Sequence, residues 1–190
     1  MVLEAMKRNR KLNVGYRKYG RETPNPLTFE PYCIKLYKQR WYVLGHFHRD
    51  ATEERDEVDY FGLFSFDRIA EMHITDEKFT LDPDFDAAVY FSECFGVVVN
   101  DCTLPEQIIL RAYDYERFYM RDLPVHHSQK VIREGEDYTD FDLYMRPTVD
   151  FNTYLLSRAT VFKVLSPQWL ADEIYNLLLD ALSRYDNGLE

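Results

Sequence analysis

Two adjacent stretches decide the fold of the first half of this chain: residues 27–37 (LTFEPYCIKLY) and residues 40–48 (RWYVLGHFH). Both are rich in aromatic and β-branched residues, and only Lys38-Gln39 separates them. They therefore predict two antiparallel strands joined by a tight turn. Side chains alternate along a strand. The second strand thus places two sets on opposite faces: Trp41, Val43, Gly45 and Phe47 on one, and Tyr42, Leu44, His46 and His48 on the other.

Further strand patterns surround this hairpin at residues 12–16, 60–66 and 69–74. Five short strands within about 65 residues, with no long helix among them, predict a small barrel. Before the first strand, Val2, Leu3 and Met6 have the spacing of a short amphipathic helix. The first part of the chain is therefore expected to be a helix followed by a five-stranded β-barrel.

The pattern changes in the second half of the chain. A helix is expected over residues 84–95, and a β-α-β-β-α-β succession follows, the split order of ferredoxin-like domains. Ser166-Pro167 is typical of the start of a last, amphipathic helix. The sequence thus predicts an α+β protein, whose parts are an N-terminal helix at 1–11, a β-barrel at 12–75, a linker helix at 76–96 and an α+β domain at 97–190.

Charge is distributed unevenly along the chain. The formal net charge is −10, which by itself argues against a nucleic-acid partner. Residues 1–40, however, hold 10 Lys and Arg against 3 acidic residues, a net of +7, and residues 41–190 hold the remaining 13 cations and 30 acids, a net of −17. Two interpretations stay open: chance clustering on solvated faces, or a local anion-binding region on an acidic body.

The three cysteines are Cys33, Cys94 and Cys102. Their odd number and the lack of a CxxC spacing argue against a zinc ribbon and a disulfide framework, and favour a reduced, cytoplasmic compartment. Two histidines on one strand, His46 and His48, supply only two metal ligands, so neither a metal nor a cofactor is predicted. No run of about 18 apolar residues is present, which argues against a membrane span.

Several motifs resemble the WYL domain, a family named for a Trp-Tyr-Leu run that reads Trp41-Tyr42-Val43 here. The resemblance rests on residues 31–35 (PYCIK), 40–45 (RWYVLG) and 64–69 (FSFDRI). The second half of the chain resembles the WCX extension that commonly follows WYL domains. That likeness rests on Tyr90-Phe91, Gly96, 123–129 (LPVHHSQ) and 164–167 (VLSP).

The resemblance implies an Sm/SH3-like barrel and a role in transcription regulation. In WYL proteins a winged helix-turn-helix typically precedes the barrel, and the barrel is thought to sense a nucleotide or single-stranded nucleic acid. The WCX part is associated with dimerisation. The residues before Leu12 leave no room for a helix-turn-helix, so the chain is expected to be either a fragment of a longer regulator or a shortened member.

Two positions depart from the family pattern. Glu30 stands where the family often has His, and Gly62 stands where it often has Arg. Both would line the ligand pocket that the resemblance implies. An acid gained and a cation lost weaken the case for an anionic ligand at that pocket.

Five residues are candidates for ligand binding: Lys35, Arg40, Tyr42, His46 and Arg68. Tyr42 and His46 would form a pocket wall, or one face of the barrel would simply be core and the other solvated. Cations interleaved with aromatic residues suit single-stranded nucleic acid. Arg68 could equally pair with Asp67, and Arg40 and Lys35 could lie on a solvated edge. Trp41 is expected in the core rather than as a stacking platform.

No catalytic constellation is recognisable, so the chain is not expected to be an enzyme. The prediction is the sensing region of a bacterial transcription regulator, which binds a nucleotide or single-stranded nucleic acid at the WYL barrel and forms a homodimer through its C-terminal domain. DNA contact would require a helix-turn-helix outside this chain, and no membrane partner is expected. The alternative is a stand-alone accessory module that binds single-stranded nucleic acid.

Overall fold

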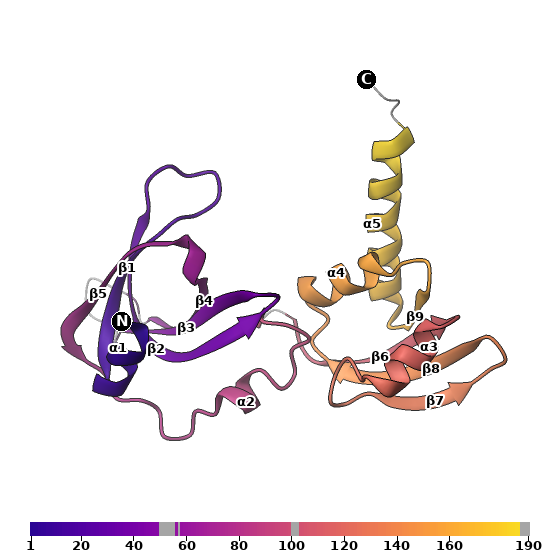
Figure 1. Ribbon diagram of the computed structural model, residues 1–190, viewed down its shortest axis with the longest axis horizontal. Helices are drawn as coiled ribbons and strands as arrows, with labels where there is room; N and C mark the ends of the chain where they lie inside the picture. The colour runs from indigo at the N-terminus through magenta and orange to yellow at the C-terminus, as the bar shows by residue number, and fades with distance from the viewer. Residues whose placement is uncertain (50–55, 57, 100–102, 187–190) are drawn as a thin grey trace. The chain divides into compact units, whose positions relative to one another are not determined.

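The computed structural model describes residues 1–49, 56, 58–99 and 103–186, and divides the chain into two compact units, Met1–Tyr90 and Phe91–Glu190 (Figure 1). Each unit combines an antiparallel sheet with helices, which confirms the predicted α+β class. Among the described residues, no helix has the length and apolar character needed to cross a membrane. Cys102 lies outside the described residues.

The first unit contains a single five-stranded sheet in the order β4-β3-β2-β1-β5. Its elements are α1 (Val2–Arg8), β1 (Arg10–Tyr16), β2 (Asn25–Tyr37), β3 (Arg40–Arg49), β4 (Val58–Ser65), the 3-10 turn η1 (Phe66–Arg68), β5 (Ile69–Lys78) and α2 (Ala87–Tyr90). Lys38 and Gln39 both have positive φ, 44° and 64°. This is the geometry of a type I′ hairpin turn, so the predicted tight turn is confirmed.

The predicted closed barrel is wrong: the sheet is open. Within the described residues β4 pairs with β3 and β5 pairs with β1, and no ladder joins β4 to β5. The sheet bends instead at β2, where the pairing with β3 is irregular between Pro31 and Cys33. Because a bulge bends its strand, the first half of β2 can pair with β1 and the second half with β3.

The core of the first unit lies between the sheet and α1. Leu12, Val14, Phe29 and Val43 are buried there with Ala5 of α1. The alternation predicted for β3 holds, since Val43 and Phe47 belong to this core. The helix is shorter than the predicted 1–11, because Asn9 adopts a left-handed conformation (φ 48°) that ends it.

The second unit has a four-stranded sheet in the order β7-β8-β6-β9. Its elements are β6 (Glu106–Tyr113), α3 (Glu116–Asp122), β7 (Lys130–Glu134), β8 (Tyr138–Met145), α4 (Val149–Ser157), β9 (Phe162–Ser166) and α5 (Gln168–Asp186). From β6 to β9 their succession is the predicted one. Its equivalence to a ferredoxin-like domain stays a prediction. The core is formed by Leu110 and Phe141 of the sheet with Met120, Phe151 and Leu170 of the helices.

Two other predicted elements differ from the structure. The helix expected over 84–95 is only α2 (Ala87–Tyr90), whose first turn is capped by the Asp86 carboxylate. Beyond it, Cys94 forms a β-bridge with Arg146, which requires extended backbone. The strand expected over 125–133 begins only at Lys130, because the preceding residues form a turn in which Gln129 N–H donates to the His126 carbonyl oxygen.

Candidate functional site

Two of the predicted site residues, Arg40 and Arg68, converge on one tyrosine in the β1–β2 loop. The guanidinium of Arg68 lies 4.1 Å from the ring centroid of Tyr19 and 4.7 Å from that of Tyr16. Arg40, at the start of β3, makes a side-chain hydrogen bond with Tyr19. We refer to Tyr16, Tyr19, Arg40, Asp67 and Arg68 as the Tyr19 cluster.

Both arginines of the Tyr19 cluster are held in place by further contacts. Arg68 Nε donates to the carbonyl oxygen of Arg17 at 2.8 Å. Arg40 lies 3.7 Å from Asp67, with both side chains about half exposed. The hydrogen bond with Tyr19 and the charge of Asp67 raise the pKa of Arg40. Asp67 therefore pairs with Arg40, and not with its neighbour Arg68 as one interpretation of the sequence had it.

The surroundings of the Tyr19 cluster are positively charged. The β1–β2 loop adds three exposed cations, Arg17, Lys18 and Arg21, and one acid, Glu22. Together with the cluster this gives five cations against two acids on a chain whose net charge is −10. The cations and the exposed Tyr19 ring form a basic surface with an aromatic side chain at its centre.

Lys35 and Tyr42 extend this surface along the sheet. They face each other across β2 and β3, and Tyr42 in turn lies opposite Ser65 of β4, just before η1. Tyr42 is close enough to Arg40 to help raise its pKa. Four of the five predicted ligand-binding residues therefore lie at this end of the sheet. Trp41 projects from the opposite face and is 52% exposed, so the expected core position is wrong.

The fifth predicted residue, His46, lies four positions further along β3 in a different environment. Its Nδ1 is 3.0 Å from Glu30 Oε2 and its Nε2 is 2.7 Å from Asp59 Oδ1. Both neighbours of the imidazole are carboxylates, which only accept hydrogen bonds. The hydrogen bond from His46 lowers the pKa of Asp59.

Glu30, one of the two carboxylates beside His46, is paired within the first unit. Lys11 Nζ lies 3.5 Å from Glu30 Oε1, while His46 contacts the other oxygen. The rings of Tyr32 and Phe61 pack against the imidazole at 5.1 Å and 4.6 Å, and its side chain is only 13% exposed. His46 is thus enclosed in an ion-pair network and stands apart from the Tyr19 cluster.

Sequence reasoning missed Tyr19, the residue that connects the two arginines. A signal was present: Tyr19 stands within the run Arg17-Lys18-Tyr19-Gly20-Arg21, an aromatic residue among three cations. The run lies between the predicted strands at 12–16 and 27–37, and no binding role was predicted for it. The cations that approach this ring come from η1 and β3, which are distant in the sequence. No local sequence pattern predicts that these elements lie beside Tyr19.

Comparison with known proteins finds a family match in the first unit. Residues 1–74 match the family model of the WYL domain. Among proteins of curated function, none matches this chain.

Two solved structures resemble the whole chain at low sequence identity. One is the proteasome accessory factor B/C (PafBC) of Arthrobacter aurescens, with 18% identity and a TM-score of 0.39. The other is described as a CRISPR Cas-related protein, with 10% identity and a TM-score of 0.55. All of this chain is covered in both comparisons, against 27% of the first protein and 51% of the second. The chain thus spans about half of the length of these proteins or less, and the likeness to the second concerns the fold alone.

Proposed function

We propose that this chain is the sensing region of a transcription regulator, and that its first unit binds single-stranded nucleic acid or a nucleotide at the Tyr19 cluster. The match of residues 1–74 to the WYL domain supports a regulatory role and not an enzymatic one. The observation that carries the proposal is the convergence of Arg40 and Arg68 on Tyr19.

In this proposal, cations and aromatic rings have separate tasks. Arg40, Arg68 and the cations of the β1–β2 loop contact phosphates, and the Tyr19 ring, 76% exposed, stacks on a base. Lys35 and Tyr42 extend the binding surface along the sheet. His46 supports the sheet through Glu30 and Asp59 instead of touching the ligand. Ligand binding would then alter the spacing of DNA-binding helices carried elsewhere in a full regulator.

The test is fluorescence anisotropy with a labelled single-stranded oligothymidine at several salt concentrations. Arg40→Ala and Arg68→Ala should each weaken binding and reduce the slope of log K against log salt by about 0.7 for each phosphate that is no longer neutralised. Tyr19→Ala should weaken binding roughly tenfold, and Tyr19→Phe should retain most of it because the ring remains. Lys78→Ala, an exposed cation at the end of β5, is the matched control. A flat titration at low salt contradicts the proposal.

The alternative, a stand-alone accessory module, uses the same surface. Two observations distinguish the alternatives: what the coding sequence upstream of Met1 encodes, and whether the protein binds double-stranded DNA. A frame that continues into a helix-turn-helix favours the regulator.

The proposal includes a homodimer formed by α5 of the second unit. The C-terminal half of α5 extends beyond α4 and β9 (Figure 1). It exposes apolar side chains at Tyr175, Leu178, Leu179 and Leu182, which are 38% to 62% exposed. Their spacing of three and four residues places them on one face of the helix.

A second copy of α5 fits this apolar face in antiparallel orientation. Pairing centred between Leu178 and Leu179 puts Tyr175 opposite Leu182 of the second copy. The second copy therefore covers the exposed apolar stripe of the first copy with an identical stripe.

Native mass spectrometry and sedimentation at several concentrations test this dimer. The wild type should be dimeric, and Leu178→Glu combined with Leu182→Glu should be monomeric because two buried charges would face each other in the seam. Asn176→Glu, on the polar side of α5, is the control and should remain dimeric. A monomeric wild type at high micromolar concentration contradicts this part of the proposal.

A further inference from the structure

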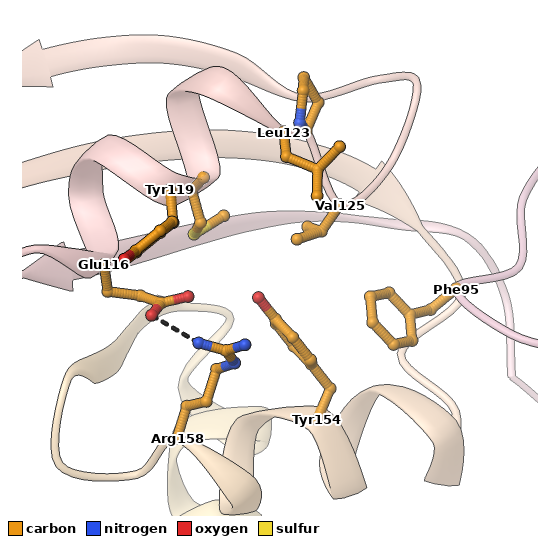
Figure 2. A pocket seen from close by; sticks show the side chains of 9 residues that line it. Phe95, Glu116, Tyr119, Leu123, Val125, Tyr154 and Arg158 are labelled. Carbon is orange, nitrogen blue, oxygen red and sulfur yellow. Dashed lines mark hydrogen bonds and ion pairs between the residues drawn. The ribbon is translucent and has the colours of Figure 1, made fainter. Parts of the chain in front are cut away.

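The second unit contains a cavity between α3 and α4 that no sequence motif predicted (Figure 2). Its volume is about 360 Å³. Cavities that hold small molecules typically measure about 300–1,000 Å³ and are mostly apolar with a few polar groups. This one has apolar walls formed by Phe95, Met120, Leu123, Val125 and the ring of Tyr119.

One end of the cavity is polar. Glu116 Oε2 accepts a hydrogen bond from Arg158 Nη1 at 2.6 Å. Figure 2 shows the Glu116 carboxylate, the Arg158 guanidinium and the Tyr154 hydroxyl directed toward the same space. Burial, and next the charge of Glu116, raises the pKa of Tyr154 to about 12, so its hydroxyl keeps its proton at neutral pH. Acceptor and donor groups thus stand side by side.

The walls of the cavity are fixed by hydrogen bonds within the second unit. Gln129 Nε2 donates to the carbonyl oxygen of Met120 at the end of α3, and Gln129 Oε1 accepts from Val125 N–H at 3.0 Å. The Phe95 and Tyr154 rings pack together with centroids 4.9 Å apart. The cavity is therefore built before any ligand arrives, which lowers the entropic cost of binding.

The charges at the polar end select against charged ligands. Glu116 is nearly buried, with a side chain 9% exposed, and its charge is balanced by Arg158. A carboxylate brought to Arg158 would lie next to Glu116, and an ammonium brought to Glu116 would lie next to Arg158. Because the Glu116 carboxylate is little exposed, its repulsion of a bound carboxylate is screened less than in bulk water. An uncharged group that both donates and accepts meets neither penalty.

We propose that this cavity binds an uncharged aromatic or heteroaromatic small molecule that carries an amide or lactam group. The carbonyl oxygen accepts from the remaining N–H groups of Arg158, the N–H donates to Glu116, and the ring lies among the apolar walls. This site is separate from the Tyr19 cluster, and it does not depend on nucleic-acid binding there.

Three near-isosteric probes test the proposal: benzamide, benzoate and benzylamine, titrated into the isotope-labelled full chain by NMR. Benzamide should bind in the millimolar range, with shifts confined to residues around Met120, Val125 and Tyr154, and roughly tenfold more tightly than either charged probe. Equal affinities for the three probes, no binding of benzamide at its solubility limit, or shifts elsewhere in the chain would overturn it.

Charge variants make the test sharper. In Glu116→Gln the charge of Arg158 is unbalanced, so benzoate should become the preferred probe. In Arg158→Met the charge of Glu116 is unbalanced, so benzylamine should become preferred. Asp172→Asn, an exposed carboxylate of α5, is the matched control and should keep the preference for benzamide. Unchanged preferences in both variants overturn the proposal.

A third variant keeps the proposal testable if the charge variants fail to fold. Tyr154→Phe keeps every ring of the cavity and removes one hydroxyl. It should weaken benzamide binding roughly fivefold without changing the order of the three probes. Wild-type affinity for benzamide in Tyr154→Phe, together with failure of the charge variants to fold, counts against the site.

Discussion

The two units use their cations in opposite ways. In the first unit, Arg68 lies over the exposed Tyr19 ring and Arg40 is hydrogen-bonded to Tyr19, and the one carboxylate of the Tyr19 cluster, Asp67, is about half exposed. In the second unit, Arg111 makes two hydrogen bonds of 2.7 Å and 2.9 Å with Asp140, which is only 3% exposed. The first arrangement leaves guanidinium N–H donors available to a ligand. In the second, the donors of Arg111 are hydrogen-bonded to a carboxylate of the same unit.

This difference teaches that the number of cations does not identify a binding surface. What matters is whether carboxylates of the same unit already occupy the guanidinium donors. Exposed ion pairs contribute little to stability, whereas breaking a buried pair leaves an uncompensated charge. The second unit should therefore be sensitive to loss of the Arg111–Asp140 pair, whereas the first unit should tolerate loss of the exposed Arg40–Asp67 pair.

The largest effect is expected for Asp140→Asn. Since Arg111, whose side chain is 21% exposed, loses its buried partner, the free energy of unfolding of the second unit should fall by about 3 kcal/mol. Urea unfolding followed by Trp169 emission, in a Trp41→Phe background, reports on this unit alone. Asp122→Asn, in an exposed pair with Arg121, is the control and should change little. Equal losses in both variants would break the comparison.

Gly45→Ala should give the next largest effect, in the first unit. A Cβ at this position would clash with a ring carbon of Phe29, which is buried in the core. Overpacking of this kind costs about 2 kcal/mol. Here Trp41 emission in a Trp169→Phe background is the measurement. Phe29→Leu should recover part of the loss in the double variant, and additive losses would contradict the steric cause.

A third prediction concerns alkaline pH and Tyr154. Its pKa in the folded state is raised to about 12, so the folded state holds a proton that the unfolded state releases above about 10. The stabilisation is complete below pH 10 and is lost as the pH rises toward 12. Between pH 9.5 and 11 the wild type should lose about 1 kcal/mol more stability than Tyr154→Phe. Parallel pH profiles would contradict this.

Asp67→Asn should have the smallest effect on stability. The Arg40–Asp67 pair is exposed on both sides, so the free energy of unfolding should change by less than about 1 kcal/mol. Binding of single-stranded oligonucleotide should nevertheless become tighter, because a negative charge leaves the Tyr19 cluster. A stability loss as large as that of Asp140→Asn would remove the contrast between the units.

Much of the local structure followed from the sequence. Alternation of side chains predicted the central hairpin of β2 and β3 and the faces of Val43 and Phe47, because a strand repeats every two residues. The helix predicted over 84–95 does not form over its full length for a non-local reason: Cys94 forms a β-bridge with Arg146. The prediction of a barrel was wrong because closure depends on whether the two edge strands pair, and no local sequence pattern determines that.

The candidate sites divide in the same way. The basic N-terminal region was visible in the charge distribution of residues 1–40, and it contains Lys35 and Arg40. The assignment of His46 to the ligand did not account for Glu30 and Asp59, which approach its ring from β2 and β4. The cavity of the second unit was invisible, since Glu116 and Arg158 are 42 residues apart in the chain.

The sequence by itself determined the α+β class, the hairpin with its Lys38-Gln39 turn and the concentration of cations before β3, because propensity, alternation and charge are properties of neighbouring residues. Only the tertiary structure decided which arginines keep their donors. Arg40 and Arg68 meet at Tyr19, while Arg111 meets the buried carboxylate of Asp140. The physical reason is that an ion pair depends on distance and burial, which the packing of distant elements sets.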